Sequence, residues 1–197
     1  MTDRMAGEIF IGGEVSRNLL PDFCTALAAQ FVTLEWGDAQ FCPETAEDLL
    51  DNCTDLEGIV VLRLCDDEAR YGAFESLEAF LREHDIPFDR YSDGRYEYDP
   101  LWACFRPGHD LCEFTTNTDR ERLFSESLLV KIAKQLEQAL DRFAARKTTQ
   151  GIAAVKAAQR RLRAAMATNY GPLPPFQLIG EAVVDATDNY PILPPQE

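Results

Sequence analysis

The stretch CFRPGHDLC, residues 104–112, gathers side chains that can bind a metal ion. Cys104 and Cys112 offer thiol sulfurs and His109 offers an imidazole, in the spacing Cys-x4-His-x2-Cys. A structural zinc site takes four such ligands, usually as two short-spaced pairs, and the sequence has no second pair of this kind. These three residues are therefore weak metal candidates. We interpret the stretch as a Pro-Gly turn leaving a strand, with His109 on the surface, and we predict no cofactor.

Three consecutive acidic residues, Asp66, Asp67 and Glu68, follow a predicted strand. At a strand end, such carboxylates could bind Mg²⁺ or act as general acids and bases. The sequence shows no partner base, nucleophile or phosphate-binding loop to accompany them. We favour a solvated loop whose negative charge suits the N-terminus of the next helix. The prediction leans against an enzyme, and whether these three acids form an active site stays open.

Aromatic residues gather on either side of the dipeptide Asp93-Gly94, which is typical of a β-hairpin turn. They are the partner-binding candidates Tyr91, Tyr96, Tyr98 and Trp102. Exposed aromatic side chains can anchor a protein partner, and aromatic side chains can equally pack across the two strands of a hairpin. Both interpretations remain, whereas the acidic residues between the aromatics disfavour a nucleic-acid backbone.

A basic face is predicted on a helix near the C-terminus. Lys156, Arg160 and Arg163 fall on one side of that helix, and Arg161 lies beside them. A basic helical face is typical of nucleic-acid contact. The alternative is docking against an acidic protein surface, which this chain itself supplies.

Charge is segregated along the chain. Residues 1–119 carry 8 Arg, no Lys and 26 Asp or Glu, a net charge of −18, whereas residues 120–170 carry 11 basic and 4 acidic residues, a net charge of +7. Residues 171–197 add 4 acids, which gives −15 for the chain. An acidic surface of this size can steer a basic protein partner.

The composition is that of a globular protein. The chain has 197 residues, of which 46% are hydrophobic and 27% charged. The sequence contains no apolar run long enough to cross a bilayer and no signal-peptide pattern at its start. We therefore expect a cytoplasmic protein without a membrane partner, in which the six cysteines are reduced.

The first part of the chain alternates strands and helices. The patterns predict strands at 8–15, 31–36 and 58–65, helices at 16–30, 43–53 and 71–86, and a hairpin at 87–105. Ser16 can cap the first helix, whose apolar stripe ends at Phe31, and Thr45 with Asp48 is typical of a capping box at the start of the second. The expected fold class is α+β, a two-layer ferredoxin-like sandwich, with a small parallel α/β sheet as the alternative. Polar residues on one strand face favour the sandwich, since a parallel sheet covered on both faces would be apolar throughout.

From residue 116 onward the pattern is helical. Apolar residues, among them Leu136 and Leu140, recur mostly every four positions between 124 and 146, and a second helix is predicted at about 152–168, with Ile152 and Val155 on its apolar side. These two helices predict a helical hairpin. The predicted organisation is an acidic head (1–115), a basic helical hairpin (116–170) and an extended Pro-rich tail (171–197). We expect the apolar stripe of residues 124–143, or a second copy of the chain, to cover the open face of the sheet.

Three functions follow from these patterns. The first is a non-enzymatic interaction or regulatory accessory protein, whose acidic head binds a basic partner and whose helical hairpin mediates docking or self-association into a homo-oligomer. The second is a nucleic-acid-associated accessory protein that uses residues 147–163. The third is a small metal-dependent enzyme.

Overall fold

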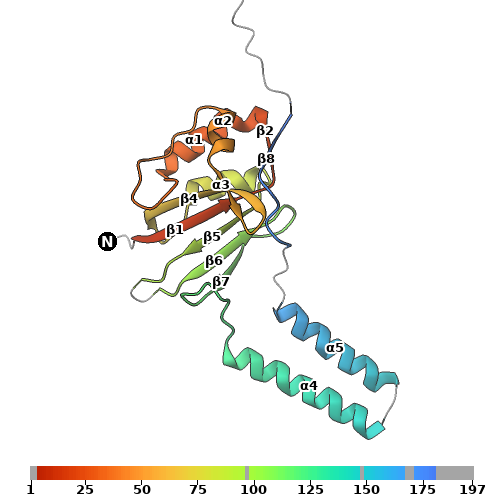
Figure 1. Cartoon of the computed structure of the whole chain (residues 1–197). Helices are drawn as coiled ribbons and strands as arrows, with labels where there is room; N and C mark the ends of the chain where they lie inside the picture. The colour runs from red at the N-terminus through yellow and green to blue at the C-terminus, as the bar shows by residue number, and fades with distance from the viewer. Residues whose placement is uncertain (1–3, 96–97, 147–148, 167–170, 181–197) are drawn as a thin grey trace, which may run out of the picture.

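The computed structural model of the chain has an α+β head and a pair of long helices that stands away from it (Figure 1). It describes residues 4–95, 98–146, 149–166 and 171–180. The strands are β1 (Arg4–Ile11), β2 (Glu14–Ser16), β3 (Cys53–Leu56), β4 (Ile59–Arg70), β5 (Phe88–Ser92), β6 (Leu101–Phe105), β7 (Cys112–Thr115) and β8 (Gln177–Ile179). The helices are η1 (Arg17–Leu19), α1 (Leu20–Gln30), α2 (Ala46–Asp51), α3 (Glu75–Glu83), α4 (Glu126–Arg146) and α5 (Thr149–Met166).

The main sheet has six strands in the order β3-β4-β1-β5-β6-β7, and every neighbouring pair is antiparallel. The predicted α+β class is confirmed, and the alternative of a parallel sheet is wrong. The reason lies in the connections. The helical connection from β1 to β3 skips over β4, and the connection through α3 from β4 to β5 skips over β1. A strand placed between two parallel strands in this way runs antiparallel to both.

One face of the sheet packs against the helices and forms the main core. The apolar side chains of β1 and β4 on this face meet the buried residues Phe23 and Leu27 of α1 and Leu77 of α3. Local signals place the helices as the sequence predicts. The Thr45 hydroxyl accepts a hydrogen bond from the Asp48 backbone N–H, and the Asp48 carboxylate accepts one from the Thr45 N–H, which is a capping box.

Two local predictions are wrong. Phe31, expected on the apolar stripe of the first helix, is 72% exposed, because it ends α1 in a left-handed conformation with φ 59°. Residues 31–36 were expected to form a strand, but they contribute only isolated bridges, in which Thr33 meets Gln40 and Cys65. The left-handed residue turns the chain away from the direction that an extended strand would need.

The second face of the sheet is partly covered by residues 171–179, called here the return segment. Leu173 packs on Phe10 and Val61 in a small second core. Phe176 is buried in the main core, and its N–H donates to the Val60 carbonyl at 2.8 Å. β8 then pairs in parallel with β2 (Figure 1). The chain therefore leaves the head after β7, forms α4 and α5, and comes back to it.

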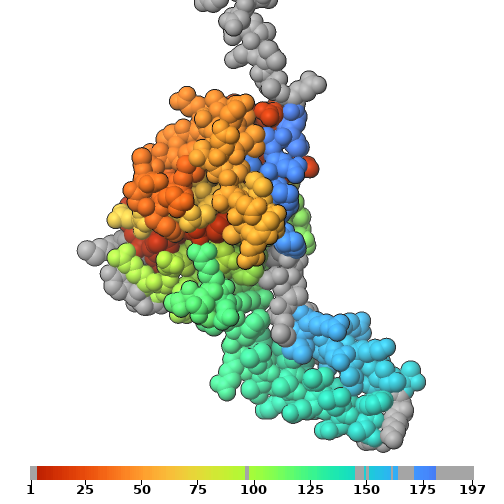
Figure 2. All heavy atoms as spheres, viewed as in Figure 1, coloured from red at the N-terminus to blue at the C-terminus, as the bar shows by residue number. Residues whose placement is uncertain are grey.

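Helices α4 and α5, called here the α4/α5 pair, pack on each other. In Figure 2 they form a lobe outside the head. At their contact, a Cβ built on Gly151 would lie 3.0 Å from the Phe143 Cα, so glycine allows the two backbones to approach closely. The apolar stripe of residues 124–143 was expected to cover the sheet, but α4 lies away from it (Figure 1), and Leu173 takes that place. In the described part of the chain, no helix is long and apolar enough to cross a bilayer.

Candidate functional site

The second face of the sheet carries a network of charged and aromatic side chains. Glu8 of β1 is buried, and its carboxylate pairs with Arg63 at 2.5 Å and with Arg120 at 2.6 Å. Arg106 donates to both carboxylate oxygens of Asp89, at 3.0 and 3.1 Å. These pairs satisfy charges that the sheet would otherwise bury alone.

Two of the predicted partner-binding aromatics pack on each other on this face. Tyr91 of β5 and Trp102 of β6 are opposite each other in register, and their rings stack with centroids 5.8 Å apart. Phe114 of β7 continues the row beside Trp102. The Arg120 guanidinium lies 4.7 Å from the Tyr91 ring centroid, a cation–π contact. Burial raises the pKa of Tyr91 to about 12. Tyr96 lies outside the described residues.

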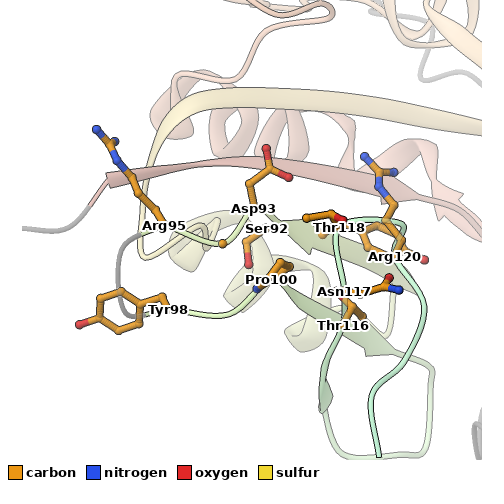
Figure 3. A pocket seen from close by; sticks show the side chains of 11 residues that line it. Ser92, Asp93, Arg95, Tyr98, Pro100, Thr116, Asn117, Thr118 and Arg120 are labelled. Atoms are coloured by element: carbon orange, nitrogen blue, oxygen red, sulfur yellow. The ribbon is translucent and has the colours of Figure 1, made fainter.

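A cleft of about 490 Å³ opens at the end of this face. Figure 3 shows Arg95 and Tyr98 on one side of it and Thr116, Asn117 and Arg120 on the other. Arg95 donates to the Arg4 carbonyl at 2.6 Å, and Arg120 pairs with Glu8, so both guanidinium groups have partners within the chain. The cleft is a defined hollow whose cations already serve the fold.

The stretch CFRPGHDLC joins β6 to β7. Cys104 and Cys112 face each other across this strand pair, and His109 is exposed in the turn between them. Gly108 has φ 77°, a conformation that glycine adopts without strain. Burial raises the pKa of Cys104 to about 12, which favours the thiol over the metal-binding thiolate. Within the described residues, no group of three or more His, Cys, Asp or Glu side chains is placed to hold a metal ion.

The three consecutive acids lie inside strand β4, so the expectation of a loop past a strand end is wrong. The Asp66 carboxylate accepts from the Glu68 N–H at 2.9 Å, and that of Asp67 accepts from the Gly37 N–H at 2.9 Å. Glu68 lies 3.8 Å from Arg4. Burial raises the pKa of Asp66. The hydrogen bonds hold the local chain in place.

The basic candidates lie on α5. Lys156, Arg160 and Arg163 are exposed and, at spacings of four and three residues, form one row along the helix. The side chain of Arg161 lies outside the described part of the structure. Comparison with protein-family models, curated proteins and solved structures gave no match. The candidate site must therefore be identified from the geometry of this chain.

The α4/α5 pair has two different sides. On one side, a cleft of about 290 Å³ is lined by Gln135, Gln138 and Arg142 of α4 and by Ala154 and Ala157 of α5. Because these residues of α4 and α5 line the same cleft, they lie on the same side of the α4/α5 pair. On the other side of the pair, across the α4–α5 contact from the cleft, each helix carries a row of apolar residues.

The apolar row on α4 is Leu129, Ala133, Leu136 and Leu140, at helical spacings of four, three and four residues. On α5 the matching residues are Ile152 and Val155. Leu129 is 45% exposed, Leu140 47% and Ile152 44%. We call these six residues the apolar face. Sequence reasoning placed Leu136, Leu140, Ile152 and Val155 on apolar stripes but missed Leu129 and Ala133. The signal was an α4 stripe wider than one partner helix can cover.

Proposed function

We propose that this chain is a non-catalytic interaction protein that self-associates through the α4/α5 pair acting as a helical hairpin. The observation that carries the proposal is the apolar face, which lies outside the head and leaves large side chains half exposed. Two helices alone cannot bury a stripe of this width. A second α4/α5 pair laid on it would complete a four-helix bundle.

The head has a separate part in this proposal. Its acidic composition suits a basic protein partner, because charge complementarity directs association and discriminates between partners. We also infer a ferredoxin-like arrangement of β1, β3, β4 and β5 with α1 and α3. The two helical connections that each skip one strand support it.

The test is the mass of the full-length protein in solution, measured by light scattering after gel filtration and by sedimentation. The variant Leu129→Ser with Leu140→Ser should shift a dimer to a monomer. Burying a whole leucine side chain contributes roughly 1.5–3 kcal/mol. Because each of these leucines is about half exposed, its burial in a dimer can contribute about half of that amount. Four such side chains per dimer amount to about 3–6 kcal/mol, or a dissociation constant raised about 100- to 10,000-fold.

The matched control replaces two leucines of the head with serine. Leu50 and Leu56 are each 43% exposed, an exposed fraction similar to those of Leu129 and Leu140. This control should leave the dimer intact. A wild-type protein that stays monomeric at about 100 μM, where even a weak contact of roughly −5.5 kcal/mol is half formed, would refute the proposal.

Nucleic-acid binding is a second candidate, supported by the exposed basic row of α5. Binding of a duplex should weaken steeply as salt rises, because phosphate contacts release counterions. Charge reversal at Arg160 and Arg163 should abolish it. Binding that neither salt nor reversal changes would exclude this row as the contact.

A further inference from the structure

Charged rows flank the apolar face, and they differ in sign between the two helices. On α4, the row beyond Leu129 and Leu140 carries three acids, Glu126, Glu137 and Asp141, against one base, Lys134, so its net charge is negative. On α5, the row beyond Ile152 is the basic row of Lys156, Arg160 and Arg163. The apolar face therefore has an acidic edge along α4 and a basic edge along α5.

Two identical α4/α5 pairs can stack through this face in two symmetric ways. With the twofold axis parallel to the helices, α4 of each subunit lies opposite the partner's α5, and the two heads lie at the same end. With the axis across the helices, α4 lies opposite the partner's α4, and the heads lie at opposite ends. The first arrangement brings the net acidic edge to the basic edge twice, whereas the second brings together two edges of the same net charge.

We infer that a second copy of this chain docks on the apolar face with the twofold axis parallel to the helices, so that both heads project from one end of a four-helix bundle. The inference rests on the proposed self-association. The charge pattern selects the occupant as well as the orientation, because the acidic and basic edges of one pair complement those of an identical pair.

The contact between Gly151 and Phe143 fixes the height of α5 against α4. Counting away from it along two antiparallel helices, Lys156 is level with residue 138, one residue or roughly 1.5 Å from the level of Glu137. A parallel twofold axis keeps the partner's α4 at the same height. Lys156 therefore meets the partner's Glu137, and the symmetric contact repeats the pair.

The experiment is charge reversal in the full-length protein, read as the dimer dissociation constant at low salt. Glu137→Lys and Lys156→Glu should each weaken the dimer about tenfold, since two surface pairs become two repulsions. The double variant Glu137→Lys with Lys156→Glu should return to within about threefold of wild type, because the pairs are restored with signs exchanged. High salt should reduce these differences.

Lys131→Glu is the control, because Lys131 is exposed on α4 and lies four and seven residues before Gln135 and Gln138, on the cleft side of the pair. It changes the net charge as Lys156→Glu does and should leave the dissociation constant within about twofold of wild type, as expected for an exposed charge away from the contact. If the heads lie at opposite ends, Glu137→Lys should tighten the dimer by removing acid–acid repulsion.

The outcomes separate the two proposals. Suppose that the two serine substitutions dissociate the dimer, but that the single charge reversals do not weaken it or the double reversal does not restore it. This result overturns the parallel arrangement alone. A dimer unaffected by the serine substitutions overturns self-association through the apolar face, and the parallel arrangement with it.

Discussion

Replacing Gly12 with alanine should release part of the return segment from the head. A Cβ at Gly12 would collide with the Pro174 carbonyl oxygen and lie 2.9 Å from Leu173 Cγ. Because backbone faces backbone here, no side-chain rotation relieves the collision. The chain must move Leu173, Pro174 and the adjoining Pro175 outward, which also removes both acceptors of the Gly13 N–H, the Pro174 and Pro175 carbonyls, each at 3.0 Å.

The cost can be estimated from what is lost. Leu173 is buried, and exposing it costs about 1.5–3 kcal/mol. The lost hydrogen bond adds about 1 kcal/mol. The sum, about 2.5–4 kcal/mol, is a large fraction of the 5–15 kcal/mol typical of a folded domain.

The assay is urea unfolding of the full-length protein, followed by far-ultraviolet circular dichroism, with limited proteolysis of the return segment. The control is Gly171→Ala. Gly171 has no heavy atom within 4 Å of a built Cβ, and its φ is not positive. Equal urea midpoints for Gly12→Ala, Gly171→Ala and wild type would show that the return segment does not pack against Gly12 as described.

Further predictions concern the interior of the head. Arg90→Met should destabilise the head by about 3–5 kcal/mol in urea unfolding, because it leaves the buried Glu78 carboxylate without its ion-pair partner. In the structure, the guanidinium of Arg90 lies 2.8 Å from that carboxylate. A loss of less than about 1 kcal/mol would contradict this prediction. With iodoacetamide at pH 8, the exposed Cys42 should be labelled well before Cys104, whose pKa burial raises to about 12, and mass spectrometry of the peptides gives the order. Asp48 has its pKa lowered by backbone hydrogen bonds at the start of α2, so its stabilisation is present at neutral pH and is lost as the pH falls through the folded-state pKa. Asp48→Ala should therefore lower the urea midpoint at pH 7 and have little effect at pH 2.

Local features of the sequence predicted local structure. The capping box of Thr45 and Asp48 formed as expected, because its hydrogen bonds join residues three apart. Ser16 likewise accepts from the Asn18 N–H ahead of α1. Tyr91 and Trp102, one on each side of Asp93-Gly94, do lie on paired strands, whereas Tyr98 lies outside them. The two-residue turn is not formed, and the strands instead end at Ser92 and resume at Leu101.

Only part of the candidate site could be predicted from the sequence. The charge segregation and the basic row of α5 follow from residue order alone, and so does the helical period of α4. Which stripe faces α5 and which stays exposed depends on how the two helices pack. The packing is fixed where Gly151 meets Phe143, a contact that periodicity does not specify.

The sequence by itself determined helix positions, caps and the separation of charge, since these depend on neighbours within one or two turns. Tertiary structure decided the strand order, the edge strand β7 and the return of residues 171–179 to pair with β2. Those features depend on contacts between residues far apart in the chain, with β8 more than 150 positions from β2. Such pairings are selected by the whole core and by its backbone hydrogen bonds, so a short stretch such as PPFQLI carries no local sign of its partner.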